Sequence, residues 1–359
     1  MTLIQIPRKN QAASSWQNSL KSAFRDSGQL AEFLGLLHEP MALATGDVGT
    51  GSNPVGKSTP MTSAIGSGDA PAFPLFVTRE FANRMRKADW NDPLLKQVWV
   101  DDKEEIVTTG FLSDPVGDSK VEIAPGLLHK YHGRVLLVTT GACAIHCRYC
   151  FRRHYPYSSA PKSIDQWEPA LEAIAADPSI REVILSGGDP LSIVDSVLSQ
   201  LVERFDRIPH LKRLRIHTRF PVVLPNRITP SLSEILNDSR LSKWIVLHSN
   251  HANEIDDDVF EAVERLRSSG AILLNQSVLL RGINDDVESL VTLSERLLEA
   301  NVLPYYLHQL DPVQSAAHFE VPIDQGRQLV MEMAKRLPGF AVPKYVYEKS
   351  GEPNKTQIY

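Results

Sequence analysis

The sequence is poor in cysteine. Only three of its 359 residues are cysteines, and all three lie between positions 143 and 150. Three thiols crowded into eight positions cannot form the paired framework of a small secreted domain, so a disulfide scaffold is excluded. A reducing cytoplasm is the setting we expect for such a chain. Its length suits one large domain with appendages, or two domains.

An excess of basic residues and long apolar runs are also absent. The formal net charge is -5, which gives no reason to expect nucleic acid or an anionic membrane as a partner. No apolar run approaches the roughly 20 residues that span a bilayer. The N-terminal stretch MTLIQIPRKNQ has no long apolar segment, so it does not resemble a secretory signal.

Composition divides the chain into four parts. Residues 1–44 carry helical spacing and predict an N-terminal helical segment, and residues 45–71 are rich in Gly, Ser, Thr and Pro, which predicts a flexible linker or insertion. Residues 72–128 predict a helical lead-in to a core over residues 129–359. The linker contains GTGSNPVGKST, but no hydrophobic strand precedes it and Pro60 stands where a helix would begin, so we reject a phosphate-binding P-loop.

Short apolar runs alternate with amphipathic helix patterns from Arg134 onward. Such runs are typical of buried parallel strands, and the patterns between them, such as DDDVFEAVERLRSSG, place apolar residues on one helix face. Six strand–helix units in a row predict an α/β fold with a parallel sheet, either an open doubly wound sheet or a barrel. The six runs are RVLLVTT, REVILSGG, LKRLRIHT, KWIVLHSN, AILLNQSVLL and LPYYLHQLD.

Polar residues stand where these predicted strands end. In a barrel of parallel strands the carboxyl ends form the mouth of the active site. A single polar residue at a strand end can simply mark the start of a loop, but several consecutive units favour a shared site. The residues are Gly187, Gly188, Asp189, His217, His248, Asn250, Gln276 and Asp311.

The cysteines form a C-x3-C-x2-C motif, CAIHCRYC, directly after the first predicted strand. Thiolates are soft ligands that suit iron–sulfur clusters, zinc or copper(I). A structural zinc site needs a fourth ligand, which His146 or His154 could supply, so zinc stays open. Three thiolates on a four-iron cluster would instead leave one iron free to bind an amino and a carboxylate group.

The motif resembles the signature of the radical S-adenosylmethionine (SAM) enzymes. The resemblance implies a [4Fe-4S] cluster held by Cys143, Cys147 and Cys150, with SAM on the open iron. It also implies a partial (β/α)6 TIM-like barrel with an N-terminal helical region. The segment SGGDPL resembles the glycine-rich segment of that family after the second strand. The SAM pocket implied by the resemblance comprises Ser186, Gly187, Gly188, Asp189, His248 and Gln276.

Longer blocks resemble the lysine 2,3-aminomutase family, over roughly residues 73–356. They include LLHKYHGRVLL, CRYCFRRHYPY, NHANE and PYYLHQLDPVQSAAHF. The resemblance implies a second cofactor, pyridoxal 5'-phosphate (PLP), on Lys355 in SGEPNKT. A primary amine is the group that forms a Schiff base with an aldehyde. By the same resemblance Arg134 grips the PLP phosphate, with Tyr131 close by.

The same family implies how a substrate would be held. Arg152 lies where the family clamps the α-carboxylate, while Asp311 and Glu348 lie where it holds the distal ammonium of lysine. The implied reaction is the isomerisation of L-lysine to β-lysine. Two carboxylates at the distal end argue against an acidic substrate such as glutamate, because like charges would meet.

The chain ends four residues after Lys355 and has no cysteine outside the motif. In this it resembles a bacterial branch that makes (R)-β-lysine, which a lysyl-transferase attaches to elongation factor P. The resemblance implies an electron donor such as flavodoxin or ferredoxin, and no nucleic acid or membrane partner. Three alternatives stay open: an aminomutase for another amino acid, a non-catalytic iron–sulfur or zinc module, and a radical enzyme that lacks the PLP step.

Overall fold

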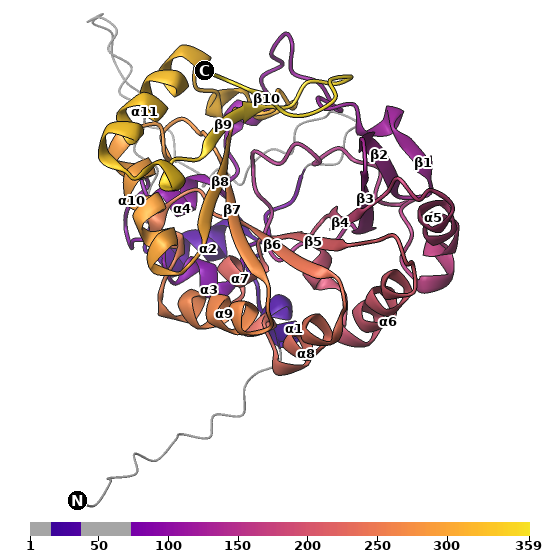
Figure 1. Ribbon diagram of the computed structural model, residues 1–359. Coiled ribbons are helices and arrows are strands. Elements are labelled where there is room, and N and C mark those ends of the chain that lie inside the picture. The colour runs from indigo at the N-terminus through magenta and orange to yellow at the C-terminus, as the bar shows by residue number, and fades with distance from the viewer. Residues whose placement is uncertain (1–15, 37–72) are drawn as a thin grey trace, which may run out of the picture.

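The computed structural model describes residues 16–36 and 73–359 (Figure 1). One ten-stranded sheet forms its centre, and the strands follow one another in sequence order from β1 to β10. The strands are β1 (Glu122–Ala124), β2 (Leu127–Tyr131), β3 (Arg134–Thr140), β4 (Glu182–Gly187), β5 (Arg213–Thr218), β6 (Ser242–His248), β7 (Ile272–Val278), β8 (Leu303–His308), β9 (Lys344–Tyr347) and β10 (Thr356–Gln357).

Seven neighbouring strands of the sheet, β3 to β9, are parallel. Each of the six links between them carries at least one helix, and Figure 1 shows these helices on the outside of a curved sheet. This is the partial barrel of six strand–helix units that the apolar runs predict, so that prediction is confirmed. The antiparallel strands β1, β2 and β10 extend the sheet at its two edges.

The outer helices bury one apolar face against the sheet. In α9 the buried residues Val259, Val263 and Leu266 follow the spacing of a single helix face, and the Asp256 side chain caps the first turn by accepting from Val259 N. The helices on this side are α5 (Ile164–Ala176), α6 (Asp195–Asp206), α7 (Phe220–Val223), α8 (Pro230–Asp238), α9 (Asp257–Ser268), α10 (Val287–Glu299) and α11 (Ile323–Arg336).

The N-terminal helices belong to the same core as the barrel. Helices α1 (Trp16–Lys21) and α2 (Ser27–Leu34) lie within residues 1–44, for which the sequence predicts a helical segment. The Trp16 ring meets the Phe220 ring edge-on, and Phe24 pairs with Val77 in a short bridge. The predicted linker over residues 45–71 lies outside the described residues.

The prediction of a helical lead-in over residues 72–128 is largely wrong. This part of the chain holds only four one-turn helices, α3 (Arg79–Ala82), α4 (Pro93–Lys96), η1 (Asp102–Glu105) and η2 (Asp118–Lys120), followed by strand β1. The apolar residues have helical spacing, but the backbone leaves the helical conformation between these short turns. Ala88 adopts a left-handed backbone with φ of 52°, and Asp92–Pro93 starts a new helix. No helix among the described residues is long and apolar enough to cross a membrane.

Gly326 offers a test of how tightly α11 packs on β9. A Cβ atom at Gly326 would lie 2.1 Å from the hydroxyl oxygen of Tyr345, whereas a Cβ at Gly339 would meet nothing within 4 Å. We expect Gly326→Ala to lower the free energy of unfolding by about 1–3 kcal/mol through overpacking. The matched control Gly339→Ala should leave it within about 0.5 kcal/mol. Urea unfolding measures both, and equal midpoints would contradict the packing.

Candidate active site

A large cavity lies inside the barrel and is lined by residues of β3 to β9. Its volume is about 1200 Å³, above the roughly 300–1000 Å³ typical of a site for one small ligand. Its lining includes Arg134 and Arg215 near the starts of strands, and His248 and His308 at strand ends. The cavity therefore has room for more than one ligand along the length of the barrel.

The three cysteines lie together on the wall of this cavity, in the loop that follows β3. All three thiols are free. Burial raises the pKa of the Cys143 thiol well above its ordinary value and that of Cys150 to about 11. The thiols of Cys143 and Cys150 are thus neutral in the protein alone, and a metal would have to displace their protons to bind. Three convergent soft donors fit an iron–sulfur cluster.

Backbone bonds and an ion pair fix the cysteine loop from outside. His146 N donates to Phe76 O at 2.9 Å, and Arg148 N donates to Gln97 O at 2.9 Å. The Arg148 guanidinium, buried in the protein, pairs with both oxygens of Glu104. The His146 imidazole bonds Pro74 O through Nδ1 and stacks on Phe73, so residues 73–76 hold it in place. Across residues 16–36 and 73–359, no group of three or more His, Cys, Asp or Glu side chains is arranged to hold a single metal ion.

The two glycines of SGGDPL are required by the packing of the protein itself. Gly187 has a φ of 119°, which side chains rarely adopt. At Gly188 a Cβ atom would lie 2.4 Å from Ala142 O. The end of β4 therefore presses directly on the backbone of the cysteine loop. This close contact places the predicted SAM segment beside the predicted cluster ligands.

Asp189 uses its carboxylate to join two strand ends. It accepts hydrogen bonds from Thr218 Oγ1 at 2.7 Å and from Arg219 N at 2.6 Å, and burial raises its pKa to about 6. The side chain is thus engaged inside the protein although the residue lines the cavity. His248 and Gln276 are paired in register on β6 and β7, and both also line the cavity. Burial lowers the pKa of His248 to about 3, so its imidazole is neutral.

The other end of the cavity holds a chain of alternating charges, Arg152–Asp118–Lys130–Glu348–Lys355. Arg152 Nε donates to Asp118 Oδ2 at 2.8 Å, and Lys130 Nζ lies 2.9 Å from Asp118 Oδ1 and 2.6 Å from Glu348 Oε1. The Lys355 ammonium pairs with the other oxygen of Glu348. Despite burial, Lys355 and Lys130 hold the pKa of Glu348 below its usual range. The structure thus places three of the predicted site residues, Arg152, Glu348 and Lys355, in one network of ion pairs.

Asp118 is a member of this chain that the sequence does not single out. Its side chain is buried, yet it lies in GDSK, which resembles an ordinary surface turn. His308 is a second such residue. Burial and the Lys355 charge lower the pKa of His308 well below its ordinary value, and its Nε2 atom has no hydrogen-bond partner among the described residues. The Nε2 atom of His217 likewise has no hydrogen-bond partner among the described residues, and burial lowers the pKa of His217 well below its ordinary value.

Arg134 presents a cation to the same part of the cavity. Its guanidinium lies over the Tyr131 ring, 4.8 Å from the centroid, and no carboxylate of the described residues pairs with it. An arginine with no carboxylate partner among the described residues, two neutral imidazoles with free Nε2 atoms and the half-buried amine of Lys355 fit a phosphate-bearing aldehyde such as PLP.

Comparisons with known proteins identify relatives of this chain. Residues 137–293 match the profile described as the radical SAM superfamily. The L-lysine 2,3-aminomutase of Escherichia coli (strain K12) is 48% identical over 80% of this chain and 83% of that protein. The enzyme of the same name from Haemophilus influenzae is 45% identical over 79% and 84%. A radical SAM methyltransferase structure from Sphaerobacter thermophilus is 15% identical, with a TM-score of 0.44 over 62% of this chain and 68% of that one.

The chain belongs to the radical SAM L-lysine 2,3-aminomutase family. It is therefore an isomerase, and lysine is the substrate consistent with its relatives. Enzymes of the L-lysine 2,3-aminomutase family use a [4Fe-4S] cluster, SAM and PLP, and the cavity described above has donors for each. The radical SAM match ends at residue 293, before strand β8, which ends at His308, and before the segment between β9 and β10 that carries Glu348 and Lys355.

Asp311 provides a pH test of this cavity. Burial raises its pKa to about 7, opposed by Lys355. Between the ordinary pKa near 4 and pH 7 the folded protein binds more protons than the unfolded chain, so stability falls as pH rises. Relative to Asp311→Asn, the free energy of unfolding of the apoprotein should decline by at most about 1.4 kcal/mol per pH unit from pH 4 to 7, and level off above 7.

Chemical unfolding of both proteins at each pH measures this difference. Asparagine is a suitable reference because it resembles the protonated carboxyl and does not titrate. Stability curves that run parallel from pH 4 to 8 would show that folding does not raise the pKa of Asp311.

Proposed function

We propose that this protein is a PLP-dependent L-lysine 2,3-aminomutase that makes (R)-β-lysine for the modification of elongation factor P. One observation supports it above the rest: the Lys355 ammonium pairs with Glu348 inside a cavity that Asp311 also lines. An alkylammonium ion, the group that ends a lysine side chain, is therefore the partner that this carboxylate accepts.

The residues that would hold the cofactors follow from their places in the cavity. Cys143, Cys147 and Cys150 would hold the [4Fe-4S] cluster, which with SAM supplies the radical. SAM would lie along the strand ends that carry Ser186, Gly187, Gly188, Asp189, His248 and Gln276. Lys355 would carry PLP, whose aldehyde binds amines reversibly, and Arg134 with Tyr131 would receive its phosphate.

Charge pairing supports lysine as the substrate. The Arg152 guanidinium is fixed by Asp118 through Nε and by Ser186 Oγ through Nη1, which pre-organises it for an α-carboxylate. At the far end Lys130 remains beside Glu348 when Lys355 leaves to bind PLP, so the Glu348 carboxylate then has room for the substrate ammonium. Asp311 would supply the second carboxylate. An acidic substrate would bring a third negative group to this end.

Product use rests on the branch that the chain resembles. The motifs CRYCFRRH and LLHKYH, with GEPNK near the C-terminal end, support the elongation factor P branch and the R configuration. In this role a low-potential donor such as flavodoxin or ferredoxin reduces the cluster, and a lysyl-transferase consumes the product. Incubation of product, transferase and elongation factor P, followed by intact-mass measurement, tests this part independently of the aminomutase reaction.

Lys355 gives the first test of the enzyme reaction. Lys355→Ala should lose PLP from the purified protein and lower β-lysine formation by about 10³-fold or more, because the amine proposed to hold the aldehyde is then absent. The matched control is Lys349→Ala, which removes an exposed lysine of the same segment that pairs only with Glu352. PLP absorbance and chromatography of the lysine isomers measure both effects. Unchanged β-lysine production in Lys355→Ala would rule out the PLP mechanism.

Asp311 gives the second test, of substrate choice. Asp311→Asn should raise KM for L-lysine at least tenfold with a smaller change in kcat, because the distal ammonium loses one of two carboxylates. The assay is anaerobic, with reconstituted cluster, PLP, SAM and dithionite, and it offers L-lysine, L-glutamate and L-alanine in turn. Faster isomerisation of glutamate by the unaltered enzyme would assign the protein to another substrate.

A further inference from the structure

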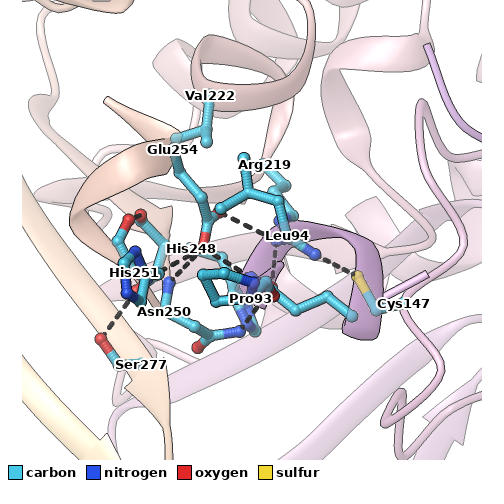
Figure 2. A network of polar contacts seen from close by, with 12 residues as sticks. Pro93, Leu94, Cys147, Arg219, Val222, His248, Asn250, His251, Glu254 and Ser277 are labelled. Atoms are coloured by element: carbon cyan, nitrogen blue, oxygen red, sulfur yellow. Dashed lines mark hydrogen bonds and ion pairs between the residues drawn. The ribbon is translucent and has the colours of Figure 1, made fainter. Parts of the chain in front are cut away.

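Arg219 lies at the wall of the cavity where the cysteine loop meets the end of β5. Its side chain is buried, and its Nη1 donates to Cys147 Sγ at 2.7 Å and to the Tyr149 hydroxyl at 2.9 Å (Figure 2). Each of the four residues that directly follow β5, from Arg219 to Val222, is also buried. A guanidinium is therefore fixed against the sulfur of a predicted cluster ligand.

The partner that balances Arg219 lies on the side away from the cysteine. Glu254 is fully buried and accepts from Arg219 Nη2 at 2.9 Å and from Gln97 Nε2 at 3.0 Å. The backbone amides of Asn250 and His251 also donate to it, at 2.8 and 2.9 Å. With four donors the carboxylate stays ionised, and Figure 2 shows Arg219 between Glu254 and Cys147.

The geometry gives this ion pair a direction. The cation, Arg219, contacts the sulfur of Cys147, and the anion, Glu254, lies on the other side of Arg219. Both groups are buried, in a low-dielectric region where charges interact strongly. Reduction of a [4Fe-4S] cluster adds one negative charge. A hydrogen-bonding cation at a ligand sulfur stabilises the reduced form, and hydrogen bonds to sulfur are a known control on cluster potential.

We propose that Arg219 is a positioning residue that raises the reduction potential of the cluster through Cys147 Sγ, and that Glu254 limits this rise. The step concerned is the uptake of one electron by the cluster from a low-potential one-electron donor, with no bond made or broken. The inference rests on the cluster that the three cysteines would hold. It assigns a role to two buried residues that neither the cofactor nor the substrate assignments use.

The ion pair is also joined to the predicted SAM pocket. The Tyr149 hydroxyl accepts from Asn250 Nδ2 at 2.6 Å as well as from Arg219, and lies 3.3 Å from His248 Nε2. Arg219 is thus held on several sides at once, which restricts its guanidinium to one orientation. A rigid donor is what a fixed effect on the potential requires.

Opposite shifts in two variants provide the test. In reconstituted protein without substrate, Arg219→Gln should lower the ratio of reduced to oxidised cluster at least tenfold at the potential where half of the wild-type cluster is reduced. That change equals about 59 mV for one electron. Glu254→Gln, which removes the negative end, should raise the same ratio. Redox titration followed by electron paramagnetic resonance measures both without any turnover.

Shifts in the same direction in both variants, or none, would overturn the proposal, because a role confined to packing predicts no change of sign. Loss of one partner leaves a buried charge and can unfold the protein, so the double variant Arg219→Gln/Glu254→Gln is included. It keeps neutral side chains of similar size and should still show a lowered ratio. The control Arg227→Gln alters another buried arginine, paired with Asp195, and should leave the ratio within twofold.

Iron and sulfide content separates this inference from the cluster assignment itself. Wild-type protein with about four irons and four sulfides per chain, together with unshifted variants, overturns only the role of Arg219. Wild-type protein that takes up no cluster under the same conditions overturns the cluster assignment and this inference with it.

Discussion

The alternating charges from Arg152 to Lys355 are the interaction on which the rest of the cavity depends. A charge that leaves water for a protein interior is tolerated only when partners surround it. Here each carboxylate lies between two cations, so Asp118 serves Arg152 and Lys130, while Glu348 serves Lys130 and Lys355. Removal of Asp118 or Glu348 would therefore leave two cations each short of one carboxylate.

This chain also joins parts of the protein that are far apart in sequence. Its members come from a turn near residue 118, from strand β2, from the cysteine loop and from the segment after β9. The strands alone would not bring Arg152, proposed to bind the substrate carboxylate, and Lys355, proposed to bind PLP, into one cavity. The ionic contacts therefore position the site as well as stabilise it, and they fix the cysteine loop at Arg152.

Regular features of the fold could be predicted from the sequence, and irregular ones could not. The six apolar runs from RVLLVTT to LPYYLHQLD each became a parallel strand because their burial on two faces leaves a continuous signal. Strand β9 was missed because KYVY is short and begins with lysine. The lead-in before residue 122 was misassigned because local spacing does not reveal where caps and a left-handed residue end a helix.

The residues of the candidate active site also divide into those that the sequence predicts and those that it does not. Residues that lie in motifs, such as the three cysteines and the glycines after β4, were found from the sequence. Asp118, Arg219, Glu254 and His308 were not singled out, although NHANE and PYYLHQLDPVQSAAHF contain Glu254 and His308, because the role of each depends on neighbours brought in by the fold. Arg219 and Glu254 lie 35 residues apart, and nothing in either local stretch distinguishes a buried ion pair from two surface charges.

Lys355 shows how tertiary structure overrides position in the chain. A lysine close to a chain end is ordinarily solvated. Here strand β10 follows it directly and pairs antiparallel with β9, Thr356 opposite Tyr347, and Ile358 N donates to Tyr345 O at 2.8 Å. The Ile358 side chain is buried, so this short edge strand is held by its backbone pairing with β9 and by the burial of Ile358. Because β9 also carries the chain into Glu348, the strand pair that orders the amine places its carboxylate partner as well.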